Sequence, residues 1–229
     1  MTSCRELLTR YRRAECRVAW LGAGGFVLLM TGAIAYYPGG NWFDPKAAGH
    51  RFWANFWCDL LHRTALNGAL NPVGSELALA GMFSMAAGLV GFWLAMPELF
   101  NSERRLAGAV RALGVLSSLG LLAVVLLPSD RFAFLHGLLV TVSGPTGIAG
   151  AIFGVIGTFR SRAPRHIFAL GAAMLLFAST VMIQYARQFW FHVAPNTWLP
   201  ALQKITTLLL LAWILTATFE VHKGQGGGR

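Results

Sequence analysis

Between Pro38 and Ser75 the chain reads PGGNWFDPKAAGHRFWANFWCDLLHRTALNGALNPVGS, and this is the one long polar interval in an otherwise apolar sequence. Polar side chains recur in its middle at intervals of three or four residues: Arg51, Asn55, Asp59 and His62. In a helix, this spacing places them on one face, opposite the aromatic and aliphatic residues between them. We therefore expect an amphipathic helix inside this loop, and we expect the loop to cover one end of a membrane-embedded helix bundle.

The composition places the chain in a lipid bilayer. Hydrophobic residues make up 55% of its 229 residues and charged residues 12%, and the mean hydropathy is +0.56. A soluble domain carries about 25% charged residues. The net charge of +10 does not indicate nucleic-acid binding, because the basic residues form short clusters between apolar runs and no continuous stripe. We expect no nucleic-acid partner.

Apolar segments with the length of about 20 residues that a helix needs to cross a bilayer recur along the chain. They cover residues 18–37, 76–97, 108–127, 134–158, 166–187 and 200–219. The sequence therefore predicts an all-α polytopic membrane protein, with a six-helix transmembrane domain over 18–219 that includes the structured loop at 38–75. A basic segment over 1–17 precedes this domain, and a glycine-rich tail over 220–229, which we expect to be flexible, follows it.

The first apolar segment and the basic residues predict the topology. Ala33-Ile34-Ala35 resembles a signal-peptide cleavage site, but the apolar run before it is long for such a peptide, so we expect an uncleaved first span. Lysine and arginine are retained on the cytoplasmic side of a membrane. With the amino terminus inside, most of the 19 basic residues fall on that side. Both termini are therefore expected in the cytoplasm and the loop outside.

Glycines in the fourth span predict close helix packing. They are spaced three or four residues apart, at Gly144, Gly147, Gly150, Gly154 and Gly157. Small residues let helix backbones approach closely within a membrane. We therefore expect this span at the centre of the bundle, with a kink at Pro145. The sixth span has no glycine, and we expect it to face lipid or an oligomer surface.

Ionisable side chains gather at the ends of the spans, and none lies in the middle third of any span. Charged groups at membrane depth are costly and usually functional, so their absence disfavours a proton relay, a voltage sensor or transport. At the outer ends, several polar residues lie at the same expected depth. We define the outer polar cluster as Arg51, Asn55, Asp59, His62, Asp130, Arg131 and His136.

Two interpretations of the outer polar cluster stay open. Carboxylates and imidazoles can ligate a metal or act as acid and base, and the catalytic candidates are then Asp59, His62, Asp130 and His136. Alternatively, the cluster is a hydrogen-bonded plug that fixes the loop over the bundle, with Asp59 paired to Arg51 or Arg131. Because no recognised zinc spacing such as His-Glu-x-x-His is present, we assign no metal, and the sequence identifies no cofactor.

Several short motifs are shared with a known family. The loop contains Asn-Phe-Trp-Cys-Asp-Leu at 55–60, then Asn-Gly and Asn-Pro, and Leu-Pro-Ser-Asp-Arg-Phe at 127–132 precedes His136. Over roughly 18–219, this pattern resembles a bacterial and archaeal family of six-helix membrane proteins catalogued only as a domain of unknown function. The resemblance implies the six-helix fold and matching polar positions at Asn55, Asp59, Asp130 and His136. The chain departs from the family pattern at Cys58 and Leu61, where serine and glycine are common. The resemblance implies no reaction.

These observations favour a non-enzymatic membrane protein whose ordered loop recognises lipid or a partner protein. It would act as an accessory subunit of a membrane complex or as a homo-oligomer. The alternative is a membrane-embedded hydrolase or transferase that acts on a lipid head group at the outward-facing Asp/His site. The resemblance implies the cytoplasmic membrane of a bacterium or archaeon. A looser similarity extends to eukaryotic six-helix proteins that act in lipid remodelling.

Overall fold

The computed structural model describes residues 4–194 and 196–224, and this part of the chain is helical without a β-strand. The long helices are α1 (Cys4–Tyr36), α2 (Pro72–Ala95), α3 (Arg104–Leu126), α4 (Ser129–Arg160), α5 (Arg165–Phe191) and α6 (Leu199–Gly224). Two short 3-10 helices, η1 (Trp57–Leu61) and η2 (Met96–Phe100), lie in the first loop and after α2. All six long helices have the length and composition to cross a membrane, which confirms the predicted fold class.

The helices extend beyond the predicted spans at several ends. The basic segment expected over 1–17 is not separate, because residues 4–17 form the first turns of α1. Residues 220–224 of the predicted tail likewise continue α6, and 225–229 lie outside the described residues. Once a helix has formed, each added residue gains a hydrogen bond at little further cost, so polar flanks extend it.

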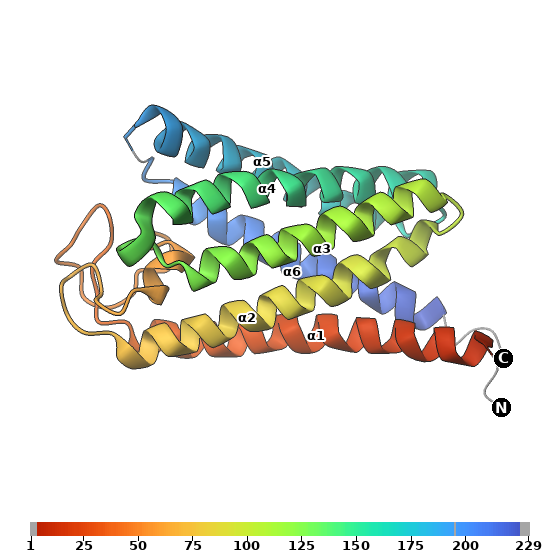
Figure 1. The fold of residues 1–229 in the computed structure, drawn as a ribbon, viewed down its shortest axis with the longest axis horizontal. Helices are drawn as coiled ribbons and strands as arrows, with labels where there is room; N and C mark the ends of the chain where they lie inside the picture. Colours follow the sequence, from red (N-terminus) through yellow and green to blue (C-terminus); the bar gives the residue numbers. More distant parts are fainter. Residues whose placement is uncertain (1–3, 195, 225–229) are drawn as a thin grey trace.

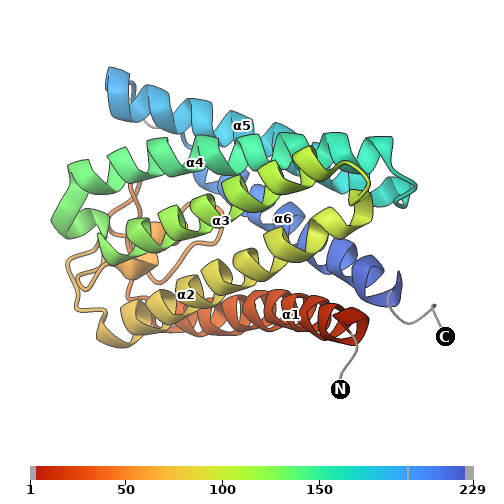
Figure 2. The same ribbon diagram turned by 45° about the vertical axis from the view of Figure 1, so that its right-hand side comes forward.

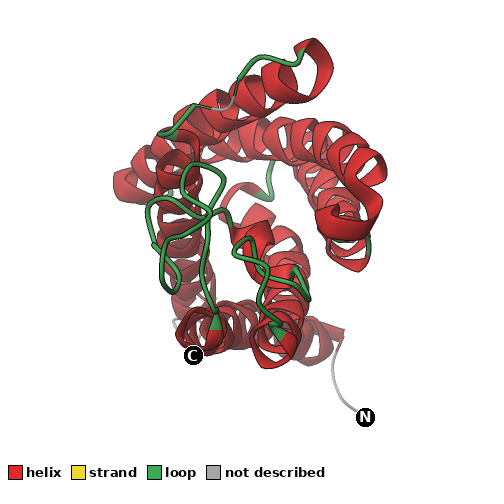
Figure 3. Cartoon of the chain, turned by 90° about the vertical axis from the view of Figure 1, so that its left-hand side faces the viewer, coloured by secondary structure: helices red, strands yellow, loops and turns green. Residues whose placement is uncertain are grey.

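The six long helices form a ring (Figures 1, 2 and 3). Each helix packs against the next one in sequence, and α6 returns to pack against α1. Both chain ends lie at one end of this ring, which we call the terminal end. The loop between α1 and α2 lies at the opposite end. We define this loop, residues 37–71, as the cap and its side of the ring as the cap end.

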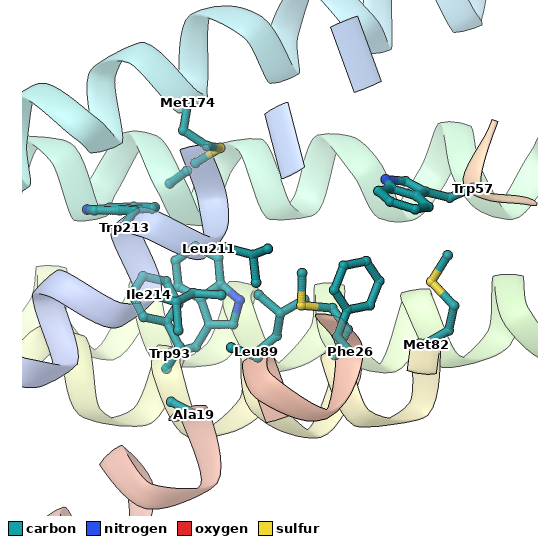
Figure 4. Packing of buried hydrophobic residues seen from close by; sticks show 14 of the residues in the cluster. Ala19, Phe26, Trp57, Met82, Leu89, Trp93, Met174, Leu211, Trp213 and Ile214 are labelled. Atoms are coloured by element: carbon teal, nitrogen blue, oxygen red, sulfur yellow. The ribbon is translucent and has the colours of Figure 1, made fainter. Parts of the chain in front are cut away.

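Aromatic side chains fill the ring toward the terminal end (Figure 4). We define the aromatic plug as Phe92 and Trp93 of α2 and Trp213 of α6. The ring centroid of Trp213 lies 5.1 Å from that of Phe92 and 6.0 Å from that of Trp93. All three side chains are buried. Glycines on two neighbouring helices leave space for these rings: Gly171 of α5 for Trp213 and Gly114 of α3 for Trp93.

The expectation that the fourth span is central was wrong. In the most apolar window of α2, 56% of the residues are buried, against 22% for α4. The glycines of α4 leave space for bulky side chains of the neighbouring helices, and they do not place α4 at the centre of the bundle. Within α4, non-helical backbone angles occur at Phe132, near its start, and not at Pro145. The sixth span does not only face lipid, because Trp213 and Ile214 are fully buried.

The amphipathic helix expected through residues 51–62 is reduced to the five residues of η1. Residues 51–54 form a turn in which the Asn55 side chain accepts a hydrogen bond from the Arg51 amide. Phe56 is extended, with ψ of 159°, and its amide donates to the Asp59 carboxylate. Asparagine and aspartate side chains compete in this way with helical hydrogen bonds, which accounts for the interruption.

Candidate functional site

Asp59 lies at the centre of the cap and is 1% exposed. Its carboxylate accepts hydrogen bonds from the Asn55 side chain (3.0 Å), the Phe56 amide (2.8 Å) and the Trp42 indole (3.1 Å). Burial raises the pKa of Asp59 above its usual value, and these hydrogen bonds and the nearby His62 act in the opposite direction. The expected proximity of Asn55 and Asp59 is present, although a turn and not a helix produces it.

Lys204 of α6 is the polar residue that the sequence analysis did not select. It is fully buried, and its Nζ donates to the main-chain carbonyl of Asn55 at 2.6 Å. The same Nζ lies 4.1 Å from the ring centroid of Trp57 and 5.7 Å from that of Phe52. An ammonium at these distances is attracted by the aromatic face. Lys204 therefore joins α6 to the cap through a buried, charge-assisted contact.

Gln203 and Thr207, which flank Lys204 on α6, extend this contact. The Trp57 amide donates to Gln203 Oε1 and the Trp57 indole to Thr207 Oγ1, both at 3.0 Å. We define the cap–α6 contact as Asn55 and Trp57 with Gln203, Lys204 and Thr207. Because all three α6 residues lie within about one helical turn, the start of α6 determines where the cap sits.

The two histidines of the outer polar cluster have other partners. His62 Nε2 lies 2.8 Å from Ser129 Oγ, so the cap also contacts the start of α4. His136 Nδ1 lies 2.8 Å from the carbonyl of Leu127, so Nδ1 carries the proton and donates it. In the described part of the chain, no hydrogen bond joins the Asp59 carboxylate to either imidazole; His62 contacts Asp59 only through its backbone amide, which donates to the Asp59 carbonyl at 3.3 Å. Nor do the described residues include a group of three or more His, Cys, Asp or Glu that could hold a metal.

The remaining charged members of the outer polar cluster are exposed. Arg51, Asp130 and Arg131 form no ion pair among the described residues. The expected pairing of Asp59 with Arg51 or Arg131 is therefore wrong. The physical reason is local, because the neighbouring amides and the Trp42 indole already occupy the carboxylate oxygens.

Apolar space lies inside the ring beneath the cap. A cavity of about 290 Å³ has residues of all six long helices and of η1 in its lining. A second cavity of about 220 Å³ lies toward the terminal end. The two share Leu89, Ser117, Gly144, Met182 and Leu210, and we define them together as the chamber. Trp57 borders the chamber on the cap side and Trp93 on the side of the aromatic plug (Figure 4).

Cys58 is the one cysteine that borders the chamber among the described residues. Burial raises the pKa of the Cys58 thiol to about 12, and the neighbouring carboxylate of Asp59 contributes to the rise. The reactive form of a cysteine is its thiolate. At neutral pH the thiol therefore stays protonated, and Cys58 acts as a small apolar wall residue and not as a nucleophile.

His50 is the cap histidine that the sequence analysis passed over. Burial lowers its pKa from 6.5 to about 4, and the positive charge of Lys204 adds to this effect. Its ring packs edge-on against Tyr37, with the ring centroids 5.8 Å apart. His50 is therefore neutral at pH 7, and protonation would place a second cation near Lys204.

Comparisons with protein-family models, with curated proteins and with solved structures found no match for this chain. The family resemblance of the loop motifs stays a prediction.

Proposed function

We propose that this protein is a non-enzymatic membrane protein that holds the hydrocarbon chain of a lipid in the chamber beneath its cap. The chamber carries the proposal, because residues of all six long helices and of η1 line it and its walls are mostly apolar. Protein interiors have few voids larger than a water molecule.

The walls of the chamber favour an alkyl chain over water. Methionines from two helices, Met82, Met85 and Met182, line it together with leucines, and methionine adapts to flexible apolar partners. Two of its few polar wall groups have partners in their own helices: Ser143 Oγ donates to Leu139 O, and Thr207 Oγ1 donates to Gln203 O. A buried water needs two to four polar partners, which these walls do not offer.

The cap supports a role as a lid over the bound chain. Trp57 borders the chamber and makes two of the hydrogen bonds of the cap–α6 contact. A hydrogen bond of this kind contributes about 1 kcal/mol net, so a few of them hold the cap without fixing it permanently. Entry or exit of a lipid would separate Trp57 from α6.

A hydrolase or transferase acting on a lipid head group is the second candidate. It would use Asp59, His62, Asp130 and His136. The hydrogen bonds of the site favour it less, because Asp59 is bonded within the cap, His62 to Ser129 and His136 to Leu127. General acid–base catalysis needs a side chain free to hydrogen-bond the substrate atom whose proton it transfers.

We also propose a bacterial or archaeal cytoplasmic membrane as the location, with the terminal end in the cytoplasm. The excess of basic residues in the terminal-end segments supports this orientation. The proposed form as an accessory subunit or homo-oligomer would bring partner proteins to the exposed apolar sides of the ring.

Lipid retention tests the proposed function. Leu210 lines both cavities, whereas Leu208, on the same helix, is 52% exposed. Native mass spectrometry of the purified wild type should detect copurified lipid. Leu210→Trp should reduce it by about five-fold or more, because overpacking an occupied site costs about 1–3 kcal/mol. Leu208→Trp should retain it. Equal lipid in all three proteins, with unchanged melting temperatures, would overturn the proposal.

A further inference from the structure

We propose that a second site, at the cap end between α2, α3 and α4, binds the head group of a zwitterionic phospholipid whose cation is a primary ammonium. A pocket of about 190 Å³ marks this site, and we call it the interfacial pocket. Residues of the cap and of all three helices line it. Four of these residues are charged: Arg63, Glu76, Asp130 and Arg131.

The four charged side chains offer both positive and negative groups to a ligand. Two are guanidinium groups and two are carboxylates, and all four residues are exposed. Within the described part of the chain, none of these side chains takes part in an ion pair. A purely anionic ligand would satisfy Arg63 and Arg131 but would be repelled by Glu76 and Asp130. A ligand with one charge of each sign satisfies both pairs.

The chemistry of each group indicates which part of the ligand it binds. A guanidinium donates several parallel N–H bonds that match the geometry of a phosphate. An ionised carboxylate only accepts hydrogen bonds, and a primary ammonium offers three donors. A trimethylammonium has no N–H to donate and is bound instead by aromatic faces, of which Phe132 offers one. The pocket therefore favours an ethanolamine-type over a choline-type head group.

The position of the interfacial pocket favours a lipid over a soluble zwitterion. It lies where α2 begins, α3 ends and α4 begins, which is the depth of the head groups around membrane-spanning helices. Apolar residues form the remaining wall, and Leu79 and Leu126 are 37% and 58% exposed on it. Acyl chains attached to the head group would lie along these side chains.

This site is separate from the chamber, and its proposal does not depend on the proposed function. No lining residue is common to the interfacial pocket and either cavity of the chamber. Leu210→Trp should therefore leave head-group selectivity at the interfacial pocket unchanged.

Lipid titration in native mass spectrometry tests the inference. The full chain in mild detergent is titrated with dioleoyl phosphatidylethanolamine, phosphatidylcholine or phosphatidylglycerol, which share their acyl chains. The wild type should bind the ethanolamine lipid more tightly than the choline lipid, by a factor of up to about five, the upper end of the range for an exposed ion pair. Equal binding of these two lipids by the wild type would overturn the proposal without any variant.

Paired substitutions then assign the roles of the charges. Glu76→Gln with Asp130→Asn should abolish the preference for ethanolamine over choline. Arg63→Gln with Arg131→Gln should weaken the binding of all three lipids. The control, Lys46→Gln with Arg51→Gln, removes two exposed cap cations outside the pocket and should change neither result. An ethanolamine preference that survives in the Glu76/Asp130 variant would contradict the inference.

Discussion

At the cap end, the chamber is closed by a loop that hydrogen-bonds to α6, whereas toward the terminal end it is closed by the aromatic plug of α2 and α6. The cap uses a few polar contacts around one buried lysine. The plug buries three large rings against glycine-bearing helices. Polar contacts of this number separate at a lower free energy than a close-packed aromatic core. We therefore expect the chamber to open at the cap end if it takes up a lipid.

The largest effect is expected from breaking the plug. Trp213→Ala should lower the free energy of unfolding by about 3–5 kcal/mol, because it removes a fully buried indole and leaves a cavity. Denaturant titration in detergent, followed by circular dichroism, measures this loss. Trp198→Ala removes an indole that is 71% exposed and should change stability by less than about 1 kcal/mol. Similar losses in the two variants would mean that the plug is not the rigid end.

Both ends show what the sequence could and could not predict. The six helices were predictable because each is an apolar run long enough to cross a bilayer, where a helix satisfies its own backbone hydrogen bonds. The aromatic plug was not predictable, because the glycines of α4 indicated close helix packing but did not identify the side chains that would fill the space beside them. Neighbouring side chains such as Phe189 at Gly137 and Phe100 at Gly157 fill that space, whereas the plug rings Trp93 and Trp213 pack at Gly114 of α3 and Gly171 of α5. Spacing along one helix carries no information about such partners.

In the cap, only the contact between residues close in sequence was predicted. Asn55 and Asp59 are close in sequence, and their side chains meet as expected. Lys204 was counted as a topology residue, since a lysine near a helix end usually extends its ammonium to the membrane surface. Its carbonyl partner on Asn55 is 149 residues away in sequence. One signal was available: Lys204 lies inside the last apolar helix, and most other basic residues lie in loops or helix ends.

Breaking the cap–α6 contact should have the second-largest effect and should be confined to one end. Lys204→Met keeps most of the side-chain volume but leaves the buried Asn55 carbonyl without its donor, a loss of about 2 kcal/mol. Hydrogen exchange followed by mass spectrometry should show faster exchange in the cap and unchanged exchange around Trp213. Lys223→Met, which removes an exposed lysine from the same helix, is the matched control. Faster exchange at both ends would mean that the two closures are coupled.

The smallest effect is a dependence of cap stability on pH. It distinguishes the cap from the aromatic plug, because the plug contains no titratable side chain. The pKa of His50 is lowered from 6.5 to about 4 by burial and by Lys204. The folded cap therefore binds fewer protons than the unfolded cap between these values. Its stability is present above pH 6.5 and is lost as the pH falls toward 4.

Asp59 acts in the opposite sense. Burial raises its pKa, so its contribution to stability is present at low pH and is lost as the pH rises through the raised value. Cap exchange, corrected for the intrinsic pH dependence of the amides, separates the two groups. His50→Gln should reduce the loss of protection between pH 6.5 and 4, whereas Asp59→Asn should increase it. The same shift in both variants would assign the pH response to another group. A pH response at the amides around Trp213 would show that the terminal end opens together with the cap.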